Sequence, residues 1–205
     1  MEKIMEIKYK NIVLRDMNES DIDDEIRWYT VETDWTHWDA PWEMEQEVLN
    51  FDPEKHREKE LKKLSEPLEK VRWGFEIDTS DGVHIGSVSS YMINGDFEWT
   101  PLSKAKPGEK LFRTVGIGIC ESSFCEKGLG TEALAAFIKY LLDCGESEIY
   151  CQTWSGNLRM VRCAEKLGFS VCRRRENLRH VRGKDYDGLT FRLDCENFRN
   201  FLSKE

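Results

Sequence analysis

The sequence predicts an α/β (α+β) domain in which a central mixed sheet of six to seven strands is flanked by about four helices. Three observations favour this class: strand-like and helix-like segments alternate along the chain, 40% of its 205 residues are apolar, and 34% are charged. This balance is typical of a globular protein, and the length suits one domain with a core of its own. We therefore expect residues 1–205 to form a single domain.

The first half of the chain supplies three strands and two helices. A short apolar strand is expected at 12–14, followed by a helix at 21–29 whose first turn is acidic, which favours the helix dipole. A second, highly charged helix is expected at 53–64, with proline at its start and another proline beyond its end. Strands at 72–78 and 83–93 flank an Asp-Gly turn and are expected to pair as a hairpin.

The second half begins with a turn-rich loop at 94–110. A strand, a helix, a strand, a helix and two final strands are then expected at 112–120, 128–144, 148–153, 157–167, 170–175 and 189–193. Glycine follows both helices, which is typical of helix ends. The hairpin between the last two strands is basic and is interpreted as a solvated surface rather than a nucleic-acid contact.

Charge and cysteine content exclude several kinds of protein. With 39 acidic and 30 basic side chains, the net charge is −9, so a nucleic-acid partner is unlikely because phosphate neutralisation needs a basic surface. The seven cysteines form no CxxC pattern, so we expect neither a disulfide framework nor a metal site. The sequence shows no signal peptide and no apolar run long enough for a membrane span, which predicts a cytoplasmic protein without a membrane partner.

A glycine-containing turn after the 112–120 strand is the first chemical signal. Gly128 and Gly130 lie where this turn opens a helix, and Lys127 adds a positive charge. Backbone N–H groups converge at such a helix N-terminus and form a cradle for an anion, which glycine allows to approach closely. The spacing fits neither a Walker loop nor the three-glycine dinucleotide fingerprint.

Two further motifs stand at fixed distances from that turn. The turn reads Lys127-Gly-Leu-Gly-Thr-Glu-Ala-Leu134, and it is followed by Asn157-Leu-Arg and by Glu165-Lys-Leu-Gly-Phe169. Together they resemble the GNAT N-acetyltransferases, and most closely the branch containing the ribosomal-protein alanine acetyltransferases and many aminoglycoside 6′-acetyltransferases. The resemblance implies one GNAT domain over 1–205, with a mostly antiparallel central sheet and acetyl-CoA as co-substrate.

The resemblance also implies roles for individual residues. The pyrophosphate loop would span 125–131, the backbone of Ile117 and Ile119 would pair with the pantetheine arm, and Asn157 would bind near the thioester. The implied cofactor-binding set is Ile117, Ile119, Cys125, Glu126, Lys127, Gly128, Leu129, Gly130, Thr131 and Asn157. Cys125 stands where the family usually has a polar side chain. Ala164 stands where a tyrosine often protonates the leaving thiolate.

The acceptor side is less defined. Acyl transfer to an amine requires that the amine lose its proton and that the developing oxyanion be stabilised. Glu121, just past the cofactor strand, is the predicted catalytic residue, and other carboxylates remain open as bases: Asp34, Asp39, Glu43, Asp96 and Glu98. Aromatic walls with nearby carboxylates suit an ammonium group. This predicts an acceptor site at Asp34, Trp35, Trp38 and Asp39, with a packed core as the equal alternative.

Three functions remain open. The first is direct transfer of acetyl from acetyl-CoA to a primary amine of a small cationic molecule, such as an aminoglycoside or a polyamine, with no covalent enzyme intermediate. The second is N-terminal acetylation of a protein such as a ribosomal protein. The third is a catalytically silent acyl-CoA-binding module, favoured by Cys125 and Ala164. Either a monomer or a homodimer is expected.

Overall fold

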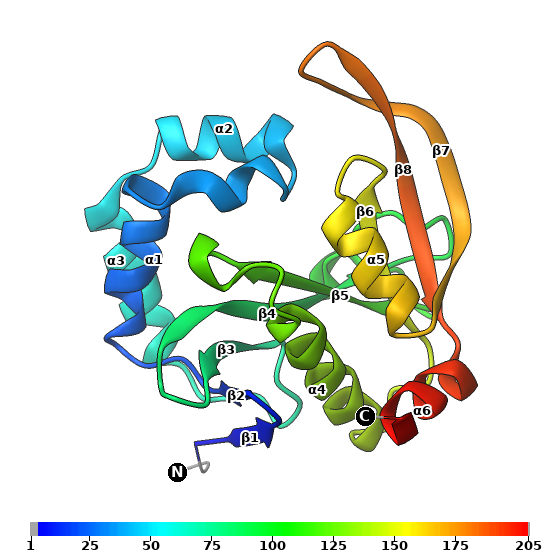
Figure 1. Ribbon diagram of the computed structural model, residues 1–205, viewed down its shortest axis with the longest axis horizontal. Helices are drawn as coiled ribbons and strands as arrows, with labels where there is room; N and C mark the ends of the chain where they lie inside the picture. The colour runs from blue at the N-terminus through cyan, green and yellow to red at the C-terminus, as the bar shows by residue number, and fades with distance from the viewer. Residues whose placement is uncertain (1–3, 205) are drawn as a thin grey trace. The chain divides into compact units, whose positions relative to one another are not determined.

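The computed structural model describes residues 4–204 and consists of a mixed sheet with α-helices packed on it (Figure 1). The described strands are β1 (Glu6–Tyr9), β2 (Ile12–Arg15), β3 (Gly74–Thr79), β4 (His84–Ile93), β5 (Phe112–Ile119), β6 (Ile149–Trp154), β7 (Phe169–Val181) and β8 (Lys184–Leu193). The described α-helices are α1 (Asp21–Thr30), α2 (Pro41–Leu49), α3 (Pro53–Leu64), α4 (Leu129–Asp143), α5 (Leu158–Lys166) and α6 (Cys195–Lys204).

The strand order confirms the predicted fold class. The strands follow one another as β1-β2-β3-β4-β5-β6-β8-β7. The pairs β1–β2, β2–β3, β6–β8 and β7–β8 are antiparallel, whereas β5 and β6 are parallel, so the sheet is mixed and mostly antiparallel. The described residues hold eight strands rather than six or seven, and six α-helices rather than about four.

The chain divides into two compact units, and the prediction of a single domain stays a prediction. The first unit consists of residues up to 88 together with 117–137. Its core includes Leu14, Ile22, Ile77, Ile85 and Phe137, which are all fully buried. Helices α1 and α3 lie side by side in this unit (Figure 1). The start of β4, the end of β5 and the start of α4 also belong to it.

The second unit consists of residues 89–116 and 138 onward. Thr114 of β5 pairs with Tyr150 of β6, and the long β7–β8 hairpin extends this part of the sheet (Figure 1). Arg174 of β7 is ion-paired with Asp187 at 2.8 Å, and Arg175 is ion-paired with Glu98. The hairpin strands are longer than the sequence predicts because their polar pattern on both faces gives no clear boundary.

The additional elements have weak sequence signals. Strand β1 is a half-exposed edge strand, so its alternation carries little apolar contrast. Helix α2 begins near the end of the tryptophan-rich segment, residues 32–43, at Pro41, after Ala40 in a left-handed conformation. Helix α6 has a readable start, because Asp194 accepts hydrogen bonds from the N–H groups of Glu196 and Asn197, as a capping residue does. None of the helices within 4–204 has both the length and the apolar character that crossing a membrane requires.

Candidate functional site

The glycine-containing turn leads from β5 into α4, within the first compact unit. Gly128 has a φ of +86°, and its carbonyl accepts from the N–H groups of Thr131 at 3.0 Å and Glu132 at 3.1 Å. A Cβ on Gly130 would lie 3.6 Å from side-chain atoms of both Ile117 and Ile119. The start of α4 therefore packs directly on the end of β5, which places the predicted pyrophosphate loop beside the predicted pantetheine strand.

Of the other residues in the predicted pyrophosphate loop, some contact the protein and others are exposed to solvent. The thiol of Cys125 lies 4.0 Å from the carbonyl oxygen of Ile119 and 3.9 Å from that of Glu121. Cys125 thus ties the loop to the end of β5. Glu126 and Lys127 are exposed, and the ammonium of Lys127 lies 5.1 Å from the centre of the Phe124 ring. Lys127 is therefore available to an anion at the loop, while Leu129 is buried and Thr131 is half-buried.

Asn157 and Ala164 belong to the second compact unit. The Oδ1 atom of Asn157 accepts a hydrogen bond from the N–H of Met160 at 3.0 Å, so Asn157 is the N-cap of α5. Its role toward a cofactor stays a prediction. Ala164 is fully buried, so position 164 offers no acid for a leaving thiolate.

Glu121 follows β5 and is held by two donors from α1. Its Oε1 atom accepts from the Arg27 guanidinium and from Trp28 Nε1, the latter at 2.8 Å, and only 16% of its side chain is exposed. Its Oε2 atom accepts no hydrogen bond from any residue in the described part of the chain. Burial raises the pKa of Glu121, but Arg27 and Trp28 outweigh it and the net pKa is lowered. Glu121 is therefore a fixed carboxylate with one oxygen available.

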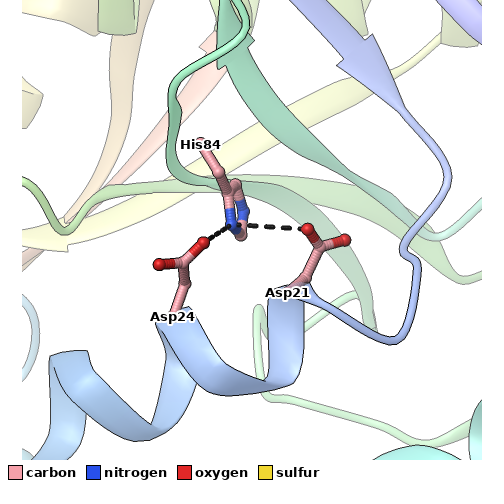
Figure 2. A group of neighbouring side chains, drawn as sticks. All are labelled: Asp21, Asp24 and His84. Atoms are coloured by element: carbon pink, nitrogen blue, oxygen red, sulfur yellow. Dashed lines mark hydrogen bonds and ion pairs between the residues drawn. The ribbon is translucent and has the colours of Figure 1, made fainter.

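A buried histidine lies next to this pair. Figure 2 shows His84 of β4 between Asp21 and Asp24, which lie one turn apart on α1. Its Nδ1 atom is 3.1 Å from Asp24 and 3.6 Å from Asp21, and its Nε2 atom is 3.0 Å from Glu76. Burial lowers the pKa of His84, but Glu76, Asp21 and Asp24 outweigh it and raise the pKa above its ordinary value.

The side chains of Asp21, Asp24 and His84 could geometrically hold a metal ion, because their ligand atoms lie within 4.8 Å of one another. However, the carboxylates of Asp21 and Asp24 already accept hydrogen bonds from arginines. Arg15 donates to both oxygens of Asp21, at 2.6 and 2.8 Å, and Arg27 donates to Asp24 at 2.9 Å. A metal would compete with two guanidinium groups, whereas a protonated His84 fits the site as it stands. The prediction that no metal is needed stays a prediction.

Aromatic rings pack where α1 meets the tryptophan-rich segment. Tyr29 stacks on Phe51 with 4.6 Å between ring centres and meets Trp35 edge-on at 5.2 Å. Trp35 also donates from Nε1 to the carbonyl of Trp28 at 2.9 Å. Trp35 is therefore part of a packed aromatic cluster, and Trp38 is half-buried beside it. Asp34 is exposed.

Asp39 lies in the same segment, just before α2, and combines two properties. It is accessible to solvent, and yet its pKa is raised, first by the protein that surrounds it and then by Glu43 and Glu47. Water reaches such a carboxylate although protein encloses most of it. The segment from 28 to 54 contains eight acidic side chains and no lysine or arginine, and Lys55, which follows it, pairs with Asp52 at 3.0 Å.

The electrostatic effects of these carboxylates converge on the end of β5. Burial raises the pKa of the Cys120 thiol, and the charges of Glu76, Asp39, Glu121 and Glu25 raise it further. Cys120 is thus a protonated thiol rather than a nucleophile. Four carboxylates, two from β3 and α1 and two from loops, act on the residue that ends the predicted cofactor strand. Glu121 is ion-paired with Arg27 and Glu76 with His84, so Asp39 contributes the negative charge at this point that could bind a further cation.

Sequence reasoning missed the residues that hold Glu121. Asp21, Asp24 and Arg27 recur every three residues on α1, which was a readable sign of one polar face. Nothing in the local sequence of His84 indicates that this face meets β4.

A family model described as acetyltransferase (GNAT) domain matches residues 11–170. A search of curated proteins gives no match. Among solved structures, a GNAT-family acetyltransferase from Bacillus anthracis has a TM-score of 0.66 at 16% identity, covering 94% of this chain and 99% of that one. A ribosomal-protein-S5-alanine acetyltransferase from Vibrio fischeri has a TM-score of 0.62 at 15% identity, covering 92% and 95%. A ribosomal L7/L12 alpha-N-protein acetyltransferase in complex with coenzyme A has a TM-score of 0.63 at 15% identity, covering 93% and 97%.

Proposed function

Because this chain belongs to the acetyltransferase (GNAT) domain family and is an acetyl-CoA-dependent N-acetyltransferase, we propose that its acceptor is a primary amine of a small cationic molecule, of the aminoglycoside or polyamine kind. The observation that carries the choice of acceptor is the convergence of four carboxylates on the end of β5. We also propose that the reaction takes place in the cytoplasm.

The acetyl group would pass directly between the two substrates. A water molecule takes the proton of the bound ammonium, and the nitrogen lone pair then attacks the thioester carbon. The C–N bond forms, and the nitrogen releases its second proton to water as the C–S bond breaks. Coenzyme A leaves as its thiolate, which takes one proton from water because position 164 carries alanine. Glu121 binds the ammonium through Oε2 and orients the nitrogen for attack. The low pKa of Glu121 favours this binding role over that of a base.

We propose that residues 125–131, with the backbone of Ile117 and Ile119, bind acetyl-CoA. Titration calorimetry should give saturable binding that weakens with dephospho analogues, because the loop N–H groups and Lys127 recognise phosphate. Gly128→Ala should weaken binding about tenfold, since alanine disfavours a positive φ and moves those N–H groups.

Gly82→Ala is the matched control for this variant. Gly82 has a φ of +82° and, like Gly128, has no atom within 4 Å of an added Cβ. The two substitutions therefore introduce similar backbone strain, but Gly82 lies in the β3–β4 turn. Equal affinities for the two variants would contradict the loop assignment. Absence of binding by the wild type at millimolar acetyl-CoA would remove cofactor binding itself.

The acceptor proposal is tested with a panel of diamines, polyamines, aminoglycosides, monoamines and peptides with free N-termini. We propose that Asp39 binds a second ammonium group of the acceptor. Asp39→Asn should therefore raise the KM for diamines and polyamines about tenfold, which is the usual magnitude of one hydrogen bond to a charged group. The KM for monoamines should change little. Asp81→Asn, in the exposed β3–β4 turn, removes the same charge outside the site and should leave both unchanged.

Each other outcome of the panel has a defined meaning. Turnover restricted to peptides would replace the small amine by a protein N-terminus. Saturable acetyl-CoA binding without turnover of any amine would identify a silent binding module. An equal effect of Asp39→Asn on monoamines and diamines would show that Asp39 does not bind a second ammonium group.

A further inference from the structure

A closed ring of side chains joins β4 to Glu121. His84 Nδ1 lies 3.1 Å from Asp24 Oδ2, and Arg27 donates to Asp24 Oδ1 at 2.9 Å. Arg27 also donates to Glu121, which accepts from Trp28 Nε1 at 2.8 Å as well. The Trp28 ring closes the circuit, because its centre lies 4.7 Å from that of His84. Each member thus contacts two others, and Glu121 is the member next to the predicted cofactor strand.

Main-chain hydrogen bonding also connects β4 to Glu121. The carbonyl of Ile85, the residue after His84, accepts from the N–H of Cys120 at 2.8 Å and is 3.4 Å from that of Glu121. Ile85 therefore fixes the backbone of Glu121, and His84 fixes its carboxylate through the ring. A carboxylate held in this way keeps one orientation of its second oxygen.

We propose that His84 is a positioning residue of the acetyl transfer site, which orients the Glu121 carboxylate toward the acceptor amine through Asp24, Arg27 and Trp28. The proposal rests on the function proposed above for Glu121. It assigns a role to a histidine that touches neither substrate, and it accounts for a charged group in the interior of the first unit (Figure 2).

His84 holds this position in its protonated form. Nε2 faces Glu76 at 3.0 Å, while Nδ1 faces Asp24 and, at 3.6 Å, Asp21. A neutral imidazole donates from one nitrogen only, so one carboxylate would then face a lone pair. The other charged or titratable groups around this site are Arg15, which neutralises Asp21, and Glu25 and Cys120, which lie within electrostatic range of Glu76. The raised pKa of His84 agrees with this geometry.

The kinetic test uses His84→Gln alone and combined with Glu121→Gln. His84→Gln should lower kcat/KM for the amine about tenfold, because a displaced orienting group lowers the fraction of attack-ready complexes. The Kd for acetyl-CoA should stay within about twofold of the wild type, because the loop is not part of the ring. The double variant should be no slower than Glu121→Gln alone, since His84 acts through Glu121.

His180→Gln is the matched control. His180 pairs with Asp185 at 2.6 Å on the exposed β7–β8 hairpin, so this variant removes a histidine–carboxylate pair without touching the ring. Its kinetics should equal those of the wild type. Independent effects of His84→Gln and Glu121→Gln that multiply in the double variant would overturn the positioning role. So would an unchanged rate in His84→Gln.

A pH titration of the wild type by NMR tests the same connection without turnover. The Trp28 indole N–H donates to Glu121, so its resonance should shift with the protonation of His84, at a pH above about 6.5. That shift should be absent in His84→Gln. A Trp28 resonance with no inflection at the pKa of His84 would overturn the connection. If no amine is acetylated but the Trp28 signal still follows His84, the proposed acceptor chemistry fails and the ring remains.

Discussion

Glu121→Gln is expected to lower kcat/KM for the acceptor amine about 100-fold, because removing the charge of a half-buried, hydrogen-bonded carboxylate would remove the ionic contact that we propose with the ammonium. The loss should be the same at every pH from 6 to 9 at which His84 is protonated. Arg27 and Trp28 keep the pKa of Glu121 below its ordinary value, so the side chain is ionised over this whole range. The pH–rate profiles of the wild type and the variant should therefore be parallel below the pKa of His84, above which the wild type loses the orientation of Glu121 and the two profiles approach each other.

Glu146→Gln is the control for this variant. Glu146 accepts from Arg113 at 2.7 Å, so the substitution removes one charge from a comparable glutamate–arginine pair in the second unit. Its rates should equal those of the wild type. A wild-type inflection between pH 6 and 9 that disappears in Glu121→Gln but persists in His84→Gln would contradict the binding role and would identify Glu121 as the general base.

The pH dependence of the unfolding free energy also tests the lowered pKa of Glu121. A group whose folded-state pKa is lowered contributes stability above its unfolded pKa, near 4.3 for glutamate, and loses it as the pH falls through the folded value. The difference in unfolding free energy between the wild type and Glu121→Gln should thus be constant above about pH 5 and should shrink below it. His84 has the opposite sign, because its raised pKa makes its contribution complete below about pH 6.5 and lost as the pH rises through the folded value.

Gly86→Ala is expected to destabilise the protein by about 3 kcal/mol or more, since overpacking against a backbone atom leaves little room for relaxation. Gly86 has a φ of +152°, and an added Cβ would lie 2.0 Å from the carbonyl oxygen of Gly118. Thermal unfolding followed by circular dichroism should show a Tm lower by about 10 °C for a chain of this length.

Two glycine variants make this prediction specific. A Cβ on Gly95 would meet nothing within 4 Å, so Gly95→Ala should change the Tm little. A Cβ on Gly118 would meet only the Cys120 sulfur at 3.8 Å, an ordinary contact, so Gly118→Ala should be tolerated although it is the other partner. If Gly86→Ala were as stable as these two, then β4 and β5 would be able to separate locally.

The turn between β5 and α4 was largely predictable because its signals are local, while its role in binding a cofactor stays a prediction. The conformation of Gly128 and the contact of Gly130 with Ile117 and Ile119 follow from a strand, a turn and a helix that are consecutive in sequence. Short-range spacing reports such units directly. The acceptor side was less predictable. Asp39 and Trp35 do lie in the first unit, but Trp35 packs on Tyr29, which only the structure reveals. Their role in binding an acceptor stays a prediction.

By itself, the sequence determined the α/β class, the glycine-containing turn at the start of a helix and the resemblance to the acetyltransferases, because each depends on residues close together in the chain. Only the tertiary structure decided the surroundings of Glu121. His84, Arg27 and Glu121 are separated by dozens of residues, and the folding of β4, α1 and β5 brings them together. Hydrogen bonds between such distant side chains lower the pKa of Glu121, and no local pattern in the sequence encodes that environment.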